Sequence, residues 1–92
     1  MSATIRIPSV LRPLTGGAAR VPVTTGATLA AAIGELGGVY PGLRDRLLDE
    51  SGQIREFVNV FVNGEDVRFL AGVETPLAPG DEVSIVPAVA GG

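Results

Sequence analysis

The sequence contains no cysteine, no histidine, no tryptophan and no lysine. The missing cysteines exclude a disulfide framework, and together with the missing histidines they exclude the usual zinc sites of structural domains. Thiol, imidazole and lysine nucleophiles are also excluded from any chemistry that the chain performs by itself. All seven cationic residues are arginines, and ten acidic residues give a net charge of −3. Carboxylates are therefore the remaining candidates for catalysis.

The acidic residues do not form a pattern that is typical of a catalytic or metal site. Several stand in adjacent pairs beside turn-forming residues: Asp49–Glu50, Glu65–Asp66 and Asp81–Glu82. Two-carboxylate catalysis needs groups that face each other across a pocket, so we interpret these pairs as solvated turn residues. We therefore predict no catalytic residue and no metal site, and we expect that the chain by itself is not an enzyme.

Charge and hydropathy exclude two further classes of protein. The arginines are scattered along the chain, whereas a nucleic-acid-binding domain needs a basic stripe, so we expect no nucleic-acid partner. No stretch reaches the roughly eighteen consecutive apolar residues of a membrane span. The opening of the sequence lacks the cationic and apolar segments of a secretory signal, so we expect a cytoplasmic protein with no membrane partner.

The length of 92 residues and the absence of an internal repeat predict one small domain. Runs of alternating or β-branched apolar residues predict strands near residues 3–9, 18–23, 56–62, 66–69 and 82–86. We interpret residues 11–17 as a loop and Asn63–Gly64 as the two-residue turn of a hairpin.

One segment has the pattern of a stable helix. Apolar residues recur at helical spacing from Leu29 to Leu36, and Thr28 precedes them as an N-cap. Gly37–Gly38 are expected to end this helix. The leucines of residues 43–48 predict a further turn or two of helix. The element order is therefore ββαβββ, with one main helix.

This order contains a single crossover, which excludes a doubly wound sheet. The compact solution is an α+β fold of the β-grasp (ubiquitin-like) type, in which a mixed sheet of about five strands packs around one main helix. The first and last strands are then adjacent and parallel at the centre of the sheet. The side chains expected to face the helix are Ile5, Ile7, Val58, Val60, Val62, Val83 and Ile85.

The opposite face of the predicted sheet mixes polar and apolar side chains. Alternation along the strands places Thr4 on this face, together with the residues that we predict to form a partner-docking face: Arg6, Asn59, Phe61, Ser84 and Val86. An exposed phenylalanine among polar residues is typical of a surface that binds a protein partner.

The last six residues are small and uncharged: Pro87, Ala88, Val89, Ala90, Gly91 and Gly92. We predict a domain of residues 1–86 followed by a flexible tail of residues 87–92. Because glycine has no Cβ, Gly91 and Gly92 can pass through a narrow passage in a partner. Pro87 and Val89 have little conformational freedom to lose when the tail is bound.

Three stretches give a resemblance to a known family. They are V-F-V-N-G at residues 60–64, L-x-P-G-D-E-V-x-I at residues 77–85, and P-x-V-x-G-G at residues 87–92. Together they resemble the ubiquitin-like sulfur carrier proteins, which include the thiamin carrier and the small subunit of molybdopterin synthase. Residues 55–69 and 5–13 look most like the actinobacterial carriers of cysteine biosynthesis.

The resemblance implies a function for the tail. In this family an E1-like, ATP-dependent enzyme adenylates the carboxylate of the final glycine, here Gly92. A sulfur donor then displaces AMP and leaves a thiocarboxylate, while residues 87–91 thread the active site of the partner. An acceptor enzyme uses the sulfur to make cysteine or another sulfur metabolite.

The resemblance also implies partners and cofactors. The acceptor would be a sulfhydrylase, a thiazole-synthase-like enzyme or a similar protein, and a metalloprotease would release a product left on the tail. ATP and Mg²⁺ would belong to the activating enzyme, and pyridoxal phosphate to a sulfhydrylase acceptor. We therefore expect that this chain binds no cofactor.

Other functions stay open at the level of sequence. The chain would be the small subunit of molybdopterin synthase if its tail stayed inserted in a catalytic partner. It would be a protein modifier if the diglycine were joined to lysines of target proteins, as in ubiquitin. A structural β-grasp domain with an unused tail is the fourth alternative.

Overall fold

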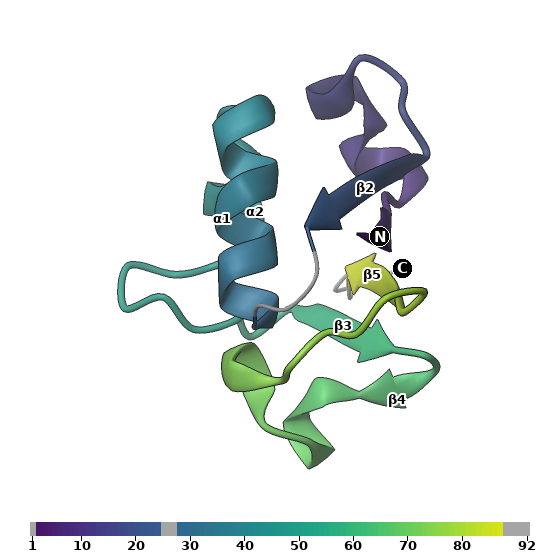
Figure 1. The fold of residues 1–92 in the computed structure, drawn as a ribbon. Helices are drawn as coiled ribbons and strands as arrows, with labels where there is room; N and C mark the ends of the chain where they lie inside the picture. The colour runs from purple at the N-terminus through teal and green to yellow at the C-terminus, as the bar shows by residue number, and fades with distance from the viewer. Residues whose placement is uncertain (1, 25–27, 88–92) are drawn as a thin grey trace.

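The computed structural model describes residues 2–24 and 28–87. Within these ranges, five strands form one sheet in the order β2-β1-β5-β3-β4. Their bounds are Ser2–Arg6 for β1, Arg20–Thr24 for β2, Val58–Val62 for β3, Glu65–Asp66 for β4 and Glu82–Pro87 for β5. The helices α1 (Leu29–Val39) and α2 (Leu43–Leu47) lie on one side of this sheet (Figure 1).

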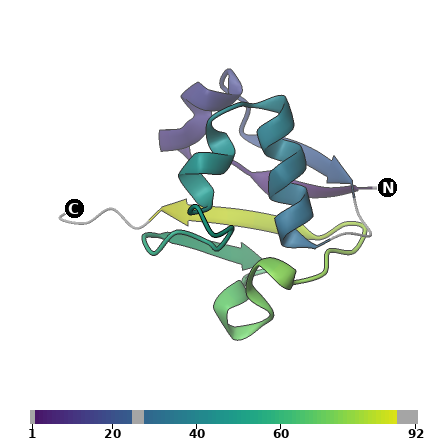
Figure 2. The ribbon, with the colours of Figure 1, turned by 90° about the vertical axis from the view of Figure 1, so that its left-hand side faces the viewer.

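The topology confirms the predicted β-grasp arrangement. β1 and β5 are neighbours and run parallel, with Thr4 opposite Glu82 and Arg6 opposite Ser84. The other neighbouring strands pair antiparallel. β1 therefore begins, and β5 ends, at opposite ends of the sheet (Figure 2).

The core lies between the sheet and the helices. Every side chain predicted to face the helix is buried, with no more than 8% of its surface exposed: Ile5, Ile7, Val58, Val60, Val62, Val83 and Ile85. These residues form one cluster with Leu29, Ile33 and Leu36 of α1. Full burial of such a side chain contributes about 1.5–3 kcal/mol, so this cluster is the main source of stability.

The sheet contains two antiparallel pairs of consecutive strands, and the second is the predicted hairpin at Asn63–Gly64. β1 and β2 pair so that Ile5 lies opposite Val21, which puts both on the core face. The turn between β3 and β4 has positive φ angles at Asn63 (51°) and Gly64 (86°). This is the backbone twist that a two-residue hairpin favours, and asparagine and glycine are the residues that tolerate it.

The predicted end of α1 at Gly37–Gly38 is wrong, although its start is confirmed. Thr28 caps the helix by accepting a hydrogen bond from the Ala31 N–H (3.3 Å). The helix continues to Val39, and the Tyr40 N–H donates to the Leu36 carbonyl (2.9 Å). Neither glycine has a positive φ, so neither forms a C-cap. The following residue, Pro41, is the natural stop because it has no N–H to donate.

Gly37 instead serves packing between the two helices. A Cβ added at this position would lie 2.7 Å from the Cβ of Arg44, closer than side-chain carbons approach. The predicted helix at residues 43–48 is confirmed as α2, and Gly37 lets α1 approach it closely.

The segment after β1 is more ordered than predicted. β1 ends at Arg6 rather than near residue 9, and the predicted loop at residues 11–17 is largely the 3₁₀ helix η1 (Ser9–Thr15). Thr15 is buried, and its hydroxyl donates to backbone carbonyls of the same segment, Arg12 (3.1 Å) and Ala18 (2.9 Å). These internal hydrogen bonds fold the segment back onto the sheet.

The strand predicted at residues 66–69 is present after the turn, but it is shorter and only its first predicted residue belongs to it. β4 contains only Glu65–Asp66, and residues 67–69 form the 3₁₀ helix η2 (Val67–Phe69). The Asp66 carboxylate accepts from the Arg68 N–H (2.9 Å), which caps this turn in place of a strand. A second 3₁₀ helix, η3 (Gly72–Glu74), follows.

The side chain of Arg68 occupies the edge of β3 that the short β4 leaves open. Its Nη2 donates to the carbonyls of Glu56 (3.2 Å) and Val58 (3.1 Å). β3 itself begins at Val58, two residues later than predicted. Throughout the described part of the chain, no helix is long and apolar enough to span a membrane.

Candidate partner-docking face and tail root

The face of the sheet opposite the helices brings together all five residues that the sequence predicts for docking. Arg6 lies opposite Ser84, and Ser84 lies opposite Phe61 on its other side. Asn59 and Val86 form a further pair, nearer the end of β5. Cross-strand neighbours on one face have Cβ atoms about 5 Å apart, so these side chains form one continuous surface on β1, β5 and β3.

This docking face offers both apolar area and ordered side chains. Val86 is 47% exposed, while Phe61 is half-buried among its neighbours. Asn59 and Ser84, which can donate and accept hydrogen bonds, are also half-buried. A partner that covers this face would bury a phenylalanine whose freedom is already restricted, and such side chains contribute most to binding.

Charge changes sign across the docking face. At one side, Arg6 forms an ion pair with Glu82, with 3.2 Å between Nη1 and Oε1. At the other side, Asp66 of β4 lies opposite Phe61. The row from β1 to β4 thus runs from the guanidinium of Arg6 through Ser84 and Phe61 to the carboxylate of Asp66. A partner that covered this face would have to match this order, which would fix its orientation.

The asparagine and aspartate of the two family-like motifs are structural. The Asp81 carboxylate accepts hydrogen bonds from the Ala78 N–H (2.8 Å) and from Nδ2 of Asn63 (2.9 Å). These bonds favour the ionised form and lower the pKa of Asp81, with the Ala78 bond contributing most. Oδ1 of Asn63 accepts from the Glu82 N–H (3.0 Å). The motifs therefore fix the start of β5 against the end of β3.

Asp49, from one of the acidic pairs, orders its own turn. The Asp49 carboxylate accepts from the hydroxyl of Ser51 (2.7 Å) and from the N–H groups of Ser51 (2.9 Å) and Gln53 (3.0 Å). These bonds, the Ser51 hydroxyl first, lower the pKa of Asp49. Among residues 2–24 and 28–87, no three acidic side chains are grouped as metal ligands.

The root of the predicted tail is the last residue of β5. Pro87 pairs with Val58 and is half-buried. The other predicted tail residues, 88–92, lie outside the described residues, so their threading of a partner and the sulfur-carrying function of Gly92 stay predictions. The tail nevertheless follows directly from the strand that carries Ser84 and Val86 of the docking face.

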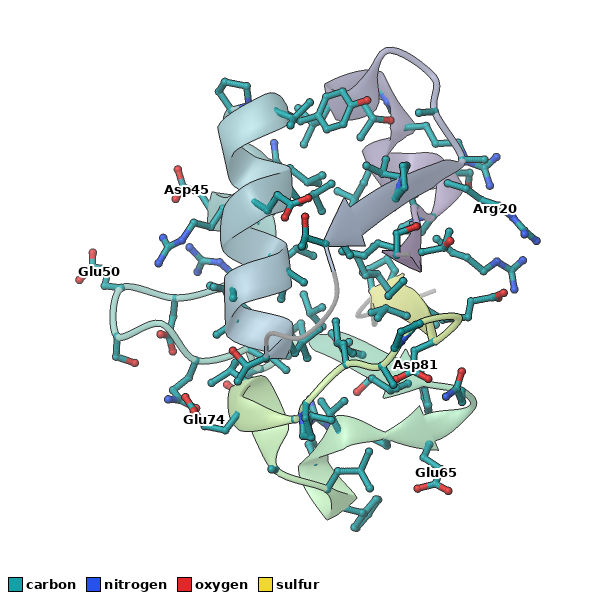
Figure 3. The ribbon with its side chains drawn as sticks, viewed as in Figure 1. Arg20, Asp45, Glu50, Glu65, Glu74 and Asp81 are labelled. Carbon is teal, nitrogen blue, oxygen red and sulfur yellow. The ribbon has the colours of Figure 1, made fainter. Side chains whose placement is uncertain are left out.

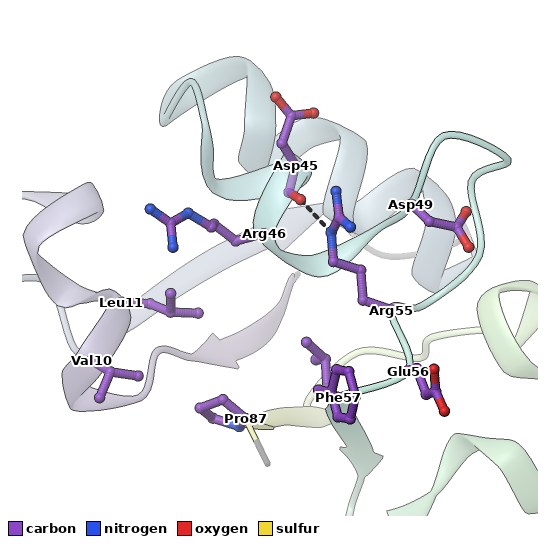
Figure 4. Close-up of a pocket in the computed structure, with 10 residues that line it drawn as sticks. Val10, Leu11, Asp45, Arg46, Asp49, Arg55, Glu56, Phe57 and Pro87 are labelled. Atoms are coloured by element: carbon purple, nitrogen blue, oxygen red, sulfur yellow. Dashed lines mark hydrogen bonds between the residues drawn. The ribbon is translucent and has the colours of Figure 1, made fainter. Parts of the chain in front are cut away.

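A groove of about 790 Å³ adjoins the tail root, and sequence reasoning did not identify it. Val10 of η1 and Phe57, about 60% exposed, lie on its two sides, with Pro87 between them (Figure 4). Arg55 lies above them, and its Nε is bonded to the Asp45 carbonyl. Antiparallel pairing of the third and last strands could have predicted Phe57 here, because it places residues before β3 beside residues at the end of β5.

Comparison with known proteins agrees with this geometry. Residues 5–92 match the model of the ThiS family. The chain belongs to this family. The match begins in β1 and includes the docking face, both motif turns and the residues of the predicted tail, so the resemblance identified from the sequence is confirmed.

The ThiS family assignment is supported by similarity over whole chains. The sulfur carrier protein CysO of Mycobacterium tuberculosis (strain ATCC 25618 / H37Rv) is 50% identical over 94 residues, which cover 100% of both chains. The crystal structure of the Amycolatopsis orientalis BexX/CysO complex contains a chain with a TM-score of 0.90 and 42% identity, covering 98% of this chain and 99% of that chain. SAMP1 from Haloferax volcanii has a TM-score of 0.81 and 30% identity, covering 100% of both chains.

Proposed function

We propose that this chain is a sulfur carrier protein whose Gly92 carboxylate is converted to a thiocarboxylate. The observation that carries the proposal is the 50% identity to the sulfur carrier CysO over 100% of both chains. The geometry supports it, because β5 contributes Ser84 and Val86 to the docking face and leads directly into the predicted tail. One strand thus links a binding surface to the proposed reactive group.

The proposed chemistry activates a poor electrophile. An activating enzyme transfers AMP from ATP to the Gly92 carboxylate, which forms an acyl adenylate and releases pyrophosphate. A sulfide or persulfide sulfur attacks the acyl carbon, and the carbon–oxygen bond to AMP breaks; a persulfide also needs a thiol reductant to cleave its sulfur–sulfur bond. The product is a thiocarboxylate on Gly92. The carrier supplies only the carboxylate, so it acts as a protein substrate and not as an enzyme.

The docking face offsets the cost of ordering the tail. Fixing the backbone of one residue costs about 1–2 kcal/mol, so a tail of five or six residues that threads a partner needs favourable contacts elsewhere. Val86, directly before Pro87, and Phe61, opposite Ser84, supply apolar area for such contacts. We therefore expect binding to depend on the face and sulfur transfer to depend on the tail.

We propose two kinds of partner for this chain. One is the E1-like activating enzyme, which uses ATP and Mg²⁺. The other is a sulfur-accepting enzyme of cysteine or other sulfur-metabolite synthesis, such as a sulfhydrylase or a thiazole-synthase-like enzyme, from which a metalloprotease would release the product. The crystal structure of a CysO in complex with BexX supports the expectation that a similar chain binds a protein partner.

Intact-protein mass spectrometry tests the proposal directly. The chain is incubated with ATP, Mg²⁺, a sulfide source and the activating enzyme of the same cell. We expect a mass rise equal to the replacement of one oxygen by sulfur, and we expect none in a variant that lacks Gly92. An unchanged mass, with an activating enzyme that is shown to be active on another carrier, would contradict the proposal.

A protein modifier is the second candidate, because SAMP1, a small archaeal modifier protein, is 30% identical over 100% of both chains. In that case the Gly92 carboxylate would be joined to amines of target proteins. Conjugates that appear in lysates of cells with the wild-type chain, and not in cells with a Gly92-deleted chain, would favour this function. The two functions therefore differ in the product formed from the Gly92 carboxylate, which is a thiocarboxylate in a carrier and an amide to a target protein in a modifier.

A further inference from the structure

Three of the seven arginines gather in one depression at the edge of the docking face. Arg6, Arg12 and Arg20 line it together with Ser84 and Val86, and its volume is about 320 Å³. Arg6, Ser84 and Val86 belong to the docking face already described. The depression is therefore continuous with that face and extends it over β1, β2 and η1.

The fold holds these arginines together. Arg6 and Arg20 are direct partners in the antiparallel pairing of β1 and β2, so their side chains leave the sheet on the same face. Nε of Arg12 donates to the Ile7 carbonyl (3.0 Å), which fastens the third guanidinium to the end of β1. Like charges directly opposite each other in a sheet are unfavourable, so this arrangement does not serve stability.

The positive charge of the depression is only partly neutralised. Within residues 2–24 and 28–87, the only ion pair is that of Arg6 with Glu82. The chain has more acidic than basic residues, so it contains enough carboxylates to form an ion pair with every arginine. Figure 3 shows Arg20 on the side of the molecule away from Asp45 and Glu50. The depression is therefore cationic on a chain whose net charge is −3.

We propose that this depression receives a carboxylate-bearing segment of the activating enzyme when that enzyme covers the docking face. The proposal rests on the proposed function. Guanidinium groups bind carboxylates through paired hydrogen bonds, and the site is small and bounded by the apolar Val86, which suits a short acidic segment of a protein. A nucleic acid would need a longer basic track and would be repelled by the rest of the chain.

The depression favours one orientation of the chain as it approaches the activating enzyme. A carrier with a net negative charge is repelled by an acidic enzyme surface in most orientations, whereas the arginines of the depression attract such a surface locally. Such steering acts mainly on the association rate and weakens as salt is added. The contact also lies beside the tail root, so the favoured orientation brings the tail toward the enzyme.

Charge reversal at Arg20 tests the proposal, with Arg44→Glu on α2 as the matched control. Both arginines are exposed, and both substitutions change the net charge equally. We expect Arg20→Glu to weaken binding of the activating enzyme by roughly tenfold, mainly through slower association at low salt, while Arg44→Glu stays within about twofold of wild type. Arg20→Gln should have an intermediate effect.

A stability measurement separates binding from folding. Arg20→Glu places a carboxylate opposite Arg6, so its midpoint of unfolding should be equal to or higher than that of the wild type. Equal association rates for the Arg20→Glu and Arg44→Glu variants would overturn the proposal. Binding of a single-stranded oligonucleotide that Arg20→Glu abolishes would also overturn it, in favour of a nucleic-acid site.

The proposed function is tested separately in the same samples, by measuring thiocarboxylate formation. Thiocarboxylate formation on the wild-type chain supports the carrier function even where the two glutamate variants bind alike. Absence of thiocarboxylate with an active enzyme would contradict the carrier function, whereas the comparison of association rates depends on binding alone.

Discussion

Asn63 and Asp81 join two turns that are 18 residues apart in the sequence, through a hydrogen bond of 2.9 Å between Nδ2 and Oδ1. Because Oδ1 of Asn63 also accepts from the Glu82 N–H, one side chain connects the hairpin after β3 with the start of β5. These bonds hold the start of β5 in place. The ionised carboxylate of Asp81 accepts its two hydrogen bonds better than the protonated form would.

This arrangement predicts that acid destabilises the fold through Asp81. Its pKa is lowered in the folded state, so the unfolded chain binds protons more readily. The stabilising effect is therefore complete above the ordinary carboxyl pKa of about 3.9 and is lost as the pH falls through the lower folded value. Urea unfolding between about pH 7 and pH 3 should show a weaker pH dependence for Asp81→Asn than for wild type. The exposed Glu65→Gln variant is the control, and equal curves for wild type and Asp81→Asn would contradict the prediction.

Glycines of α1 should respond in opposite ways to alanine. Gly34→Ala adds a Cβ with no atom within 4 Å, so the higher helix propensity of alanine should stabilise the protein by about 0.5–1 kcal/mol. Gly37→Ala places a Cβ 2.7 Å from that of Arg44 and should destabilise by about 1–3 kcal/mol. Chemical denaturation measures both. A stabilised Gly37→Ala variant would show that α1 and α2 do not need this close approach.

The docking face predicts a difference between two phenylalanines. Phe61→Arg should weaken binding of the activating enzyme by about tenfold or more, because a charge replaces the apolar centre of the face. Phe69→Arg is the control, since Phe69 is 87% exposed on η2 and lies outside the face. Calorimetric titration of both variants, after circular dichroism has shown that they are folded, measures the difference. If the affinity of Phe61→Arg for the activating enzyme were unchanged, the assignment of the docking face would be contradicted.

The tail should affect transfer more than binding. A side chain at Gly91 is expected to obstruct a narrow passage, so Gly91→Val should lower the rate of thiocarboxylate formation by about a hundredfold. Its affinity for the activating enzyme should change much less than that of Phe61→Arg. The two quantities are obtained from single-turnover mass spectrometry and from titration. A Gly91→Val variant with wild-type transfer rates would show that the passage is wide.

The sequence correctly predicts which residues lie on each face of the sheet, because successive residues of a strand point to opposite faces. Strict alternation in Val58, Val60 and Val62 places each on the core face, and all three are buried. The same alternation correctly places Phe61 and Ser84 on the opposite face. Period-two patterns survive small errors in strand bounds. For this reason the side of the sheet on which each residue lies was predicted correctly, while several strand ends were not.

The errors arise where a distant contact decides the local structure. Gly37–Gly38 have the composition of a helix end, but packing against Arg44 explains Gly37, and the helix continues to Val39. Residues 66–69 have strand-like composition, but the Asp66 carboxylate caps a 3₁₀ turn. The cationic depression was missed because Arg12 and Arg20 join Arg6 only through strand register and the fold of η1.

The guanidinium of Arg68 substitutes for the strand that β4 does not supply. Since it already occupies the carbonyls of Glu56 and Val58, an extended peptide that approaches this edge must first displace a charged group. The sheet is thereby protected from growth by strand addition along β3. A side chain thus does the work of an edge strand, and it closes this edge to a second copy of the chain without adding a residue to the sheet.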